Sequence, residues 1–360
     1  MTQHERRPRT QKLIALLRDR IASGQYPNGS FLPSERRLAG ELGVARNTLR
    51  LILGQLEREG RVFRAGGRGV IVRSSLGSSS GALISVLLPH MLTEGERPLT
   101  PEGMALLGGT LCAASRKHLR FQLGGVPRGG ATPLIEFVRG SQAAGVIFIE
   151  CRDAKLLATL REQNIPYVVV NQERDIPGPA SRVDFWSIGR EAAEHLLALG
   201  HRRLGVLVGL SEWQMYDRML AGFRGRAAES EVYIAPNHVA QNPSDSEVAR
   251  ARAIEMLTGP DRPTAIFGMR DVMAYGAYLA ARELGLRVPE DLSLIGYDDL
   301  GWPGQQRDFL TTFQEPTDQL GATGVEMLLS WIDTGKAPED AVIKPKIIVR
   351  NSTGPAPSAP

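Results

Sequence analysis

Two kinds of hydrophobic pattern follow one another along the 360-residue chain. Up to about residue 60, apolar residues recur every three or four positions, which predicts amphipathic helices. From residue 82 onward, short runs rich in valine, isoleucine and leucine alternate with helical patterns. Residues 74–81, between the two parts, are mostly serine and glycine, a composition typical of a flexible linker. We therefore predict a small N-terminal domain, a linker and a large α/β domain.

The apolar runs of the large domain lack the alternation of a half-exposed strand. They are predicted to be strands buried on both faces of parallel sheets, with helices between them. The helical patterns are clearest over residues 189–199 and 271–284. The strand candidates cover residues 82–89, 120–124, 145–150, 167–171, 204–209, 265–269 and 292–297.

The N-terminal domain, over residues 10–73, is predicted to begin with two helices. Leu13, Leu17 and Ile21 form one apolar stripe on the first helix. Ser34 is placed to cap the start of the second, because a serine hydroxyl accepts hydrogen bonds from the first free amides of a helix. The nine polar residues before this domain show no stripe and are expected to form a loose arm.

A third helix, expected over residues 46–59, presents Arg46, Asn47 and Arg50 on the face opposite its apolar residues. A short helix, a tight turn and such a helix are the arrangement of a helix-turn-helix. In its major-groove contacts arginine reads guanine and asparagine reads adenine. Two short apolar runs then flank a basic, glycine-rich segment around Arg68, which predicts a β-hairpin wing. The domain is therefore predicted to bind double-stranded DNA.

The distribution of charge supports this prediction. Residues 1–75 contain 15 lysines and arginines against 6 aspartates and glutamates, whereas the whole chain carries only +4. A basic N-terminal domain on a mildly acidic remainder suggests a polyanionic partner.

The N-terminal domain resembles the gluconate-repressor (GntR) winged-helix family. The resemblance rests on IASGQY at residues 21–26, LPSERRLA at 32–39, LGVARNTLR at 42–50 and LEREG at 56–60. After the second recognition arginine the family often has Glu-Ala, where this chain has Leu51 and Ile52. By position, the resemblance implies DNA contacts from Arg36, Arg46, Asn47, Thr48 and Arg50, and a wing tip formed by Gly66, Gly67 and Arg68.

In the large domain, most predicted strands end in polar residues. Ligands of open parallel sheets bind beyond the carboxyl ends of the strands. Such ends, with His90, Asn171, Arg270, Asp271 and Asp298 among them, are what a site for a polar small molecule needs. Tryptophans such as Trp186, Trp213 and Trp302 could cover the apolar faces of a sugar.

The large domain resembles the effector domain of the lactose-repressor (LacI) family. The resemblance rests on GHRRLGV at residues 200–206, RPTAIF at 262–267, DVMAYG at 271–276, GLRVPEDLSLIGYDD at 285–299, LTTF at 310–313 and IVRNST at 348–353. It implies a two-lobed, periplasmic-binding-protein-like domain over residues 82–353 and usually a dimer. The implied crossovers near Asp184, Pro316 and Val342 give lobe 1 as residues 82–184 and 316–341, and lobe 2 as 185–315 and 342–353. Residues 354–360 are expected to be a frayed tail.

The same resemblance assigns effector contacts, with departures from the family pattern. Asp298, the first acid of the Gly-Tyr-Asp-Asp run, is the principal candidate. Arg270 stands where the family usually has asparagine, which leaves room for an acidic or phosphorylated effector. Arg218 lies four residues before Gly222 rather than three. The effector candidates are Asp298, Arg270, Asp271, Arg218, Trp186, His90 and Trp302.

The sequence argues against an enzyme, a cofactor or a metal site. GSSSG at residues 77–81 matches a hydrolase nucleophile motif but lies in the linker. There is no phosphate-binding glycine loop, dinucleotide fingerprint or metal-ligand spacing. Two cysteines, no signal segment and no long apolar run suggest a cytoplasmic protein.

These observations predict a transcription repressor controlled by a sugar-like effector and acting as a homodimer on a pseudo-palindromic operator. An activator, and a binding module whose N-terminal domain is only architectural, remain as alternatives at this point.

Overall fold

The computed structural model describes residues 3–23, 25–26, 30–58, 61–64, 69–72, 82–88, 101–126, 131–151, 153–171, 178–211, 213–241, 243, 245–299 and 308–357, without the side chains of residues 3–9, 22 and 63. Outside these residues lie the predicted wing tip at Gly66, Gly67 and Arg68, the linker with its GSSSG motif, and the effector candidates His90 and Trp302. Those predictions stay predictions.

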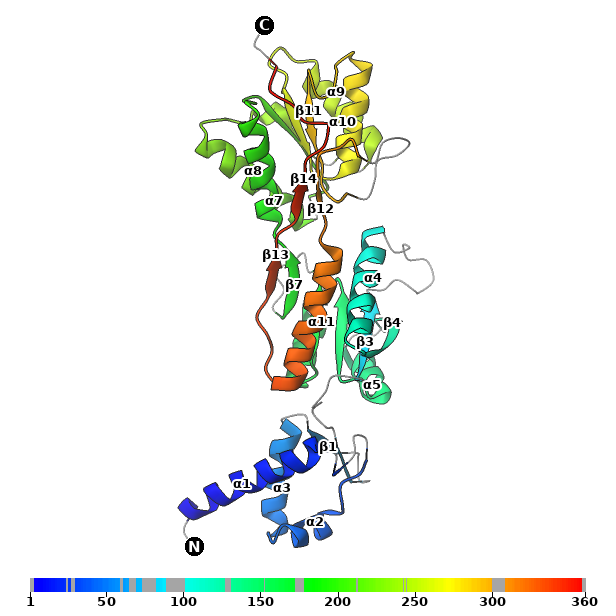
Figure 1. The fold of residues 1–360 in the computed structure, drawn as a ribbon, viewed down its shortest axis with the longest axis vertical. Helices are drawn as coiled ribbons and strands as arrows, with labels where there is room; N and C mark the ends of the chain where they lie inside the picture. The colour runs from blue at the N-terminus through cyan, green and yellow to red at the C-terminus, as the bar shows by residue number, and fades with distance from the viewer. Residues whose placement is uncertain are drawn as a thin grey trace.

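The N-terminal domain consists of three helices and a β-hairpin (Figure 1). Its elements are α1 (Gln3–Ala22), α2 (Glu35–Glu41), α3 (Arg46–Arg58), β1 (Val62–Arg64) and β2 (Val70–Val72). The two strands pair antiparallel, with Val62 opposite Val72. The Ser34 hydroxyl accepts a hydrogen bond from the Arg37 amide and caps α2, as predicted. The apolar stripes of the helices are buried together in one core.

The start of α1 corrects the expectation of a loose arm, because the helix already begins at Gln3. Five of the seven residues from Gln3 to Arg9 are glutamine, glutamate or arginine, which favour helix without forming an apolar stripe, whereas Pro8 disfavours it. A prediction based on apolar periodicity therefore starts the helix too late.

Lobe 1 of the large domain is a six-stranded parallel sheet with helices on both faces. Its strands are β3 (Leu83–Leu88), β4 (Arg120–Gly125), β5 (Gly145–Ile149), β6 (Tyr167–Val170), β7 (Ala180–Val183) and β13 (Ala341–Ile343), in the order β13-β7-β6-β5-β3-β4. Its helices are α4 (Pro101–Arg116), α5 (Ala131–Ser141), α6 (Ala154–Glu162) and α11 (Thr317–Thr334). In β5, Val146 and Phe148 pack with α5 and α6, whereas Ile147 and Ile149 pack with α4 and α11. Because helices cover both faces of the sheet, strands such as β5 and β6 are continuously apolar and do not alternate between apolar and polar residues.

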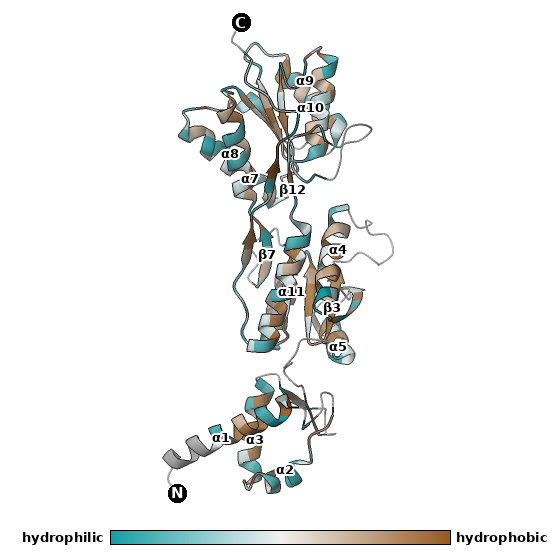
Figure 2. Cartoon of the chain, viewed as in Figure 1, coloured by the Kyte–Doolittle hydropathy of each residue, from teal (hydrophilic) through white to brown (hydrophobic). Residues whose placement is uncertain are grey.

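Lobe 2 repeats this architecture around a four-stranded parallel sheet. The strands are β8 (Leu204–Val208), β9 (Val239–Gln241), β10 (Ala265–Gly268) and β11 (Ser293–Ile295), in the order β11-β10-β8-β9. The helices are α7 (Phe185–Ala198), α8 (Gln214–Glu229), α9 (Ser246–Leu257) and α10 (Asp271–Glu283), with a 3-10 turn at Pro236–His238. Figure 2 shows hydrophobic residues concentrated in the strands and hydrophilic residues on the outer helix faces. The predicted α/β fold class with parallel sheets is confirmed.

Within the residues that the structure describes, the chain passes between the lobes three times. The first passage follows β7 at Asp184, and the second lies at Pro316, before α11. Between the lobes, β12 (Thr312–Gln314) pairs antiparallel with β14 (Lys346–Ile348). Val342 lies inside β13, opposite Arg182 of β7, so the third passage comes after the predicted position, between β13 and β14. The extra residues of lobe 1 are held there by strand pairing, which the sequence pattern did not reveal.

The C-terminal segment also differs from the sequence expectation, because residues 352–356 are fastened to lobe 2. The Ser352 hydroxyl donates to the Leu294 carbonyl at 2.7 Å, and the Ala356 amide donates to the Leu199 carbonyl at 2.8 Å. Buried His201 lies between them, with Nε2 3.1 Å from the Gly354 carbonyl and Nδ1 2.9 Å from the Thr264 hydroxyl. Side-chain and backbone hydrogen bonds together order this segment although it lacks an apolar pattern.

Burial lowers the pKa of His201 from its ordinary value of 6.5. The imidazole therefore stays neutral in the native state at a pH where the unfolded chain takes up a proton. Its contribution to stability is complete above pH 6.5 and is lost as the pH falls below that value. We expect wild-type protein to lose more stability than His201→Gln between about pH 7.5 and 5.5, measured as urea midpoints. Equal losses in the two proteins would show that His201 does not carry this dependence.

Candidate DNA interface and effector site

The exposed face of α3 carries the residues predicted to read DNA. Four of the five apolar side chains of α3 are buried in the domain core, whereas Leu51 is 71% exposed, and the opposite face of the helix is turned outward. Arg46, Asn47 and Arg50 are exposed on the helix, and Thr48 is half-buried. Arg36, from α2, is also exposed. The helix thus presents two guanidinium groups one turn apart, the spacing needed to reach neighbouring base edges.

The wing is anchored to the segment that leads into α2. The Leu32 amide donates to the Val70 carbonyl at 2.7 Å, and the Val72 amide donates to the Ser30 carbonyl at 2.8 Å. These bonds extend the hairpin by a short third segment. They fix the base of the wing relative to the helix-turn-helix.

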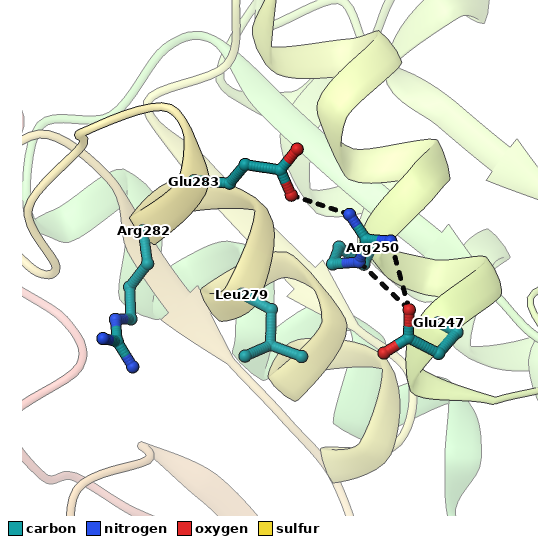
Figure 3. Close-up of a pocket in the computed structure, with 5 residues that line it drawn as sticks. All are labelled: Glu247, Arg250, Leu279, Arg282 and Glu283. Atoms are coloured by element: carbon teal, nitrogen blue, oxygen red, sulfur yellow. Dashed lines mark hydrogen bonds and ion pairs between the residues drawn. The ribbon is translucent and has the colours of Figure 1, made fainter.

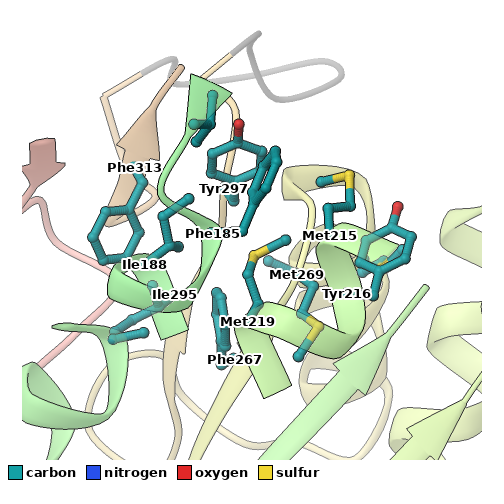
Figure 4. Close-up of a cluster of buried hydrophobic side chains, with 14 of the residues drawn as sticks. Phe185, Ile188, Met215, Tyr216, Met219, Phe267, Met269, Ile295, Tyr297 and Phe313 are labelled. Carbon is teal, nitrogen blue, oxygen red and sulfur yellow. The ribbon is translucent and has the colours of Figure 1, made fainter. Parts of the chain in front are cut away.

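In the large domain, Asp298 and Arg270 meet at the carboxyl ends of β11 and β10. The Arg270 Nε donates to the Asp298 Oδ2 at 2.5 Å, and the Asp298 side chain is only 5% exposed. Asp298 has a φ of 115°, a conformation that non-glycine residues rarely adopt. The preceding residue, Tyr297, is buried, and its ring packs edge-on against that of Phe185 with centroids 6.0 Å apart (Figure 4).

Arg270 also connects the two lobes. Its guanidinium forms an ion pair with Glu102, the second residue of α4 in lobe 1. Two carboxylates from different lobes therefore flank one guanidinium. Any change in the angle between the lobes must alter this contact.

Asp271 is brought next to Asp298, but its own oxygens are engaged by protein donors. The Thr312 hydroxyl donates to Oδ1 at 2.6 Å, and the Asp299 amide donates to Oδ2 at 3.1 Å. Burial and the charge of Asp298 raise the pKa of Asp271 to about 8, although the Thr312 hydrogen bond opposes the shift. The carboxyl group of Asp271 thus ties β12 and the turn at 298–299 to the start of α10.

The strand ends of lobe 1 bring a second polar group toward the lobe connection. Asn171 is buried after β6, and its Nδ2 donates to Glu150 at 3.2 Å and to Glu315 at 3.4 Å. Glu150 follows β5, whereas Glu315 lies in the passage between β12 and α11. One amide therefore links two strand ends to the connecting segments.

Two further candidates lie on the helices of lobe 2. Trp186 is 45% exposed near the start of α7, with the Arg190 guanidinium 5.6 Å from its ring centroid. Arg218 is exposed on α8, whereas its neighbour Met219, in the position expected for the family's effector arginine, is fully buried. The one-residue shift therefore places an apolar side chain in the core and the arginine outside it.

A hollow between α9 and α10 lies apart from these residues (Figure 3). In it, Arg250 pairs with Glu283 at 2.7 Å and with Glu247 at 3.1 Å. These exposed groups satisfy one another, as on an ordinary solvated face. Within the described part of the chain no group of acidic, cysteine or histidine side chains is arranged to hold a metal ion. Among the same residues, no helix has the length and apolarity needed to cross a membrane.

The sequence did not reveal Glu102, Thr312 or Glu315 as parts of this arrangement. Glu102 and Glu315 belong to no recognisable motif, and the LTTF run that contains Thr312 does not reveal its contact with Asp271, because each of the three reaches its partner across a long stretch of chain. Glu102 lies at the start of α4, and Thr312 and Glu315 lie in or directly after β12. Their contacts depend on the three-dimensional fold and could not be predicted from the sequence.

Comparisons with known proteins identify both parts of the chain. The model of the bacterial regulatory proteins, gntR family, matches residues 9–72, and that of the periplasmic binding protein-like domain matches residues 193–353. The arabinose metabolism transcriptional repressor of Geobacillus stearothermophilus is 28% identical over 360 aligned positions, covering 92% of this chain and 94% of that protein. The HTH-type transcriptional repressor PurR of Escherichia coli is 34% identical over 212 positions, covering 56% of this chain and 60% of PurR.

The fold of the large domain is also found among solved structures. A regulatory protein of the LacI family from Chloroflexus aggregans superimposes with a TM-score of 0.64 at 23% identity, covering 75% of this chain and 98% of that chain. The motifs, the two folds and these matches agree. The chain is a transcription regulator that joins a DNA-binding domain of the gntR family to a periplasmic-binding-protein-like domain of the kind found in LacI-type regulators.

Proposed function

We propose that this regulator is a cytoplasmic repressor whose affinity for its operator is controlled by a small polar effector bound between the two lobes. The observation that carries the DNA-binding half is the exposed row of Arg46, Asn47 and Arg50 on α3, in a domain that matches the gntR family. Repression is supported by the two relatives named above, both of which are called transcriptional repressors.

The effector proposed is a sugar or a neutral sugar derivative. Carboxylates and guanidinium groups at strand ends, such as Asp298 and Arg270, bind pairs of neighbouring hydroxyls well. Because Arg270 already contacts the carboxylates of Asp298 and Glu102, a further anion there would meet two negative charges. This favours a neutral ligand over an acidic one. The relative that aligns along most of this chain is named for arabinose metabolism.

A homodimer is proposed as the binding unit. The edge strand β4 exposes Phe121 and Leu123, and neighbouring α5 exposes Phe137. Uncovered edge strands with apolar side chains promote association, and a second copy can cover them. Two-fold symmetry then places two winged helices on a pseudo-palindromic operator.

Replacing either recognition arginine tests the DNA-binding half. An operator is first selected from random duplexes with the wild-type protein. Arg46→Ala and Arg50→Ala are each expected to weaken operator binding by about 1–3 kcal/mol, because each removes a guanidinium capable of bidentate pairing with guanine. Fluorescence anisotropy at fixed salt measures the affinity, and a titration at high concentration gives the number of chains per operator.

Arg252→Ala is the control, since this exposed arginine lies on α9 of lobe 2, away from both α3 and the proposed dimer surface. Unchanged operator affinity in both α3 variants would refute the proposed recognition face. Failure of the wild type to select any sequence would favour a purely architectural N-terminal domain.

A further inference from the structure

A chain of alternating charges joins the recognition helix to the base of the wing. Glu35, the first residue of α2, contacts Arg50 of α3 through Oε2 at 3.0 Å. Its other oxygen lies 3.8 Å from Nη1 of Arg64, the last residue of β1. Arg64 in turn pairs with Glu57 of α3 at 3.3 Å, and its backbone amide donates to the same carboxylate at 3.1 Å.

This arrangement is poorly suited to stabilising the fold. The side chains of Arg50 and Arg64 are 60% and 45% exposed, and ion pairs so exposed contribute little free energy. Glu35 also places a negative charge next to a surface that must meet phosphates, which disfavours binding to any DNA. A carboxylate in the first turn of α2 also stabilises the helix slightly through its dipole, but that effect does not require its oxygens to face two arginines, so these contacts need another physical role.

Orientation supplies that role. An arginine side chain has several rotatable bonds, and fixing it before binding removes part of the entropy cost of recognition. The contact with Glu35 uses the Nε of Arg50, while a guanidinium carries five donors in a fixed fork. Arg50 can therefore be held by Glu35 and still present its outer donors to a base edge.

We propose that Glu35 is a positioning residue for DNA recognition. Its carboxylate holds Arg50 and Arg64 in the orientation that reads the operator, and its charge weakens the hold on other sequences. The inference rests on the proposed DNA-reading role of α3. It predicts opposite effects on specific and non-specific binding, which neither a structural role nor simple charge repulsion produces.

The experiment compares Glu35→Gln with wild type on the selected operator and on a scrambled duplex of equal length. Removing the carboxylate is expected to weaken operator binding about fivefold to tenfold, the scale of coupling between groups in one hydrogen-bond network. Binding to the scrambled duplex is expected to stay equal or become tighter. Glu41→Gln is the matched control, because it removes the same charge from α2 and its partner is Arg37. Its ratio of specific to non-specific affinity should not change.

A double-mutant cycle completes the test. In an Arg50→Ala background, Glu35→Gln should no longer lower operator affinity, because the side chain that it positions is absent. The proposal is overturned if Glu35→Gln strengthens both kinds of binding equally, or if its effect persists in that background. Melting temperatures of all variants are measured, and Glu35→Asp, which keeps the charge, should retain more specificity than Glu35→Gln. If the wild type selects no operator, the proposed function itself is contradicted. If it selects one but Glu35→Gln leaves the ratio of specific to non-specific affinity unchanged, only the role proposed for Glu35 is contradicted.

Discussion

Asp298→Asn is expected to abolish the effector response while leaving operator affinity unchanged. The carboxylate is nearly fully buried at the end of β11 and is held by Arg270, so it has a fixed direction toward a ligand at the strand ends. An amide of the same size keeps one acceptor oxygen but loses the charge and one of the two acceptors that a pair of sugar hydroxyls uses. The winged helix lies in a separate domain and keeps its own core.

The measurement combines thermal shift with operator binding. A panel of neutral sugars, sugar acids and sugar phosphates is screened with wild type, since a ligand at a hundred times its Kd stabilises the native state by about 2.7 kcal/mol. The best ligand is then tested for its effect on operator affinity in wild type and variant. The two ligands must be coupled reciprocally, each altering the other's affinity by the same factor.

Asp291→Asn is the matched control for this substitution. Asp291 lies in the same lobe and pairs with Arg287 at 2.9 Å just before the amino end of β11, at the other end of that strand from Asp298. A normal response in Asp298→Asn would remove Asp298 from the effector site. A response confined to acids or phosphates in wild type would contradict the neutral ligand inferred from the two carboxylates around Arg270.

Much of the fold could be predicted because its strongest features repeat in the sequence. The long apolar runs that became β3, β5, β6, β8 and β10 are buried on both faces, so their composition alone predicts them. The strands that were missed, such as β9 and β13, are three residues long. A segment of that length shows no periodicity, and only pairing with a neighbouring strand defines it.

The sequence predicted those residues of the candidate sites that can be recognised one at a time, from residue type and position in a predicted helix or strand. Arg46, Asn47 and Arg50 could be found because helical spacing places them on one face. Asp298 and Arg270 could be found because both lie at strand ends. Glu35 and Glu102 could not be found, because each is singled out only by its contact with an arginine that is distant in the sequence. Sequence patterns locate donors and acceptors, whereas their pairing across elements is a property of the packed chain.

Gly189→Val is expected to have the largest effect on stability in the large domain. The backbones of α7 and α8 touch at two glycines. A Cβ added at Gly189 would lie 1.8 Å from the Met219 carbonyl oxygen, and one at Gly222 would lie 2.0 Å from the Trp186 carbonyl oxygen. Backbone atoms cannot move aside as a flexible side chain can. A valine must therefore push the two helices apart along their whole contact.

Separation of α7 and α8 would open the core of lobe 2 at Met219 and Phe223, both of which are fully buried. Overpacking a core commonly costs 1–3 kcal/mol, and a clash with backbone atoms belongs at or beyond the upper end of that range. We expect Gly189→Val to destabilise the protein by about 3 kcal/mol or more, measured by urea unfolding, and Gly189→Ala to lie between it and wild type. Because Asp184, where the chain enters lobe 2, caps the start of α7, the effector response should weaken as well.

Gly225→Ala provides the control on the same pair of helices. A Cβ at Gly225 of α8 meets nothing within 4 Å. Alanine is favoured over glycine in a helix interior by about 1 kcal/mol, so this variant should be slightly more stable than wild type. The same chemical change is thus expected to have opposite signs at two positions, according to whether backbone lies opposite. If alanine at 189 and at 225 shifted stability alike, the close contact of α7 and α8 would not be what requires glycine at position 189.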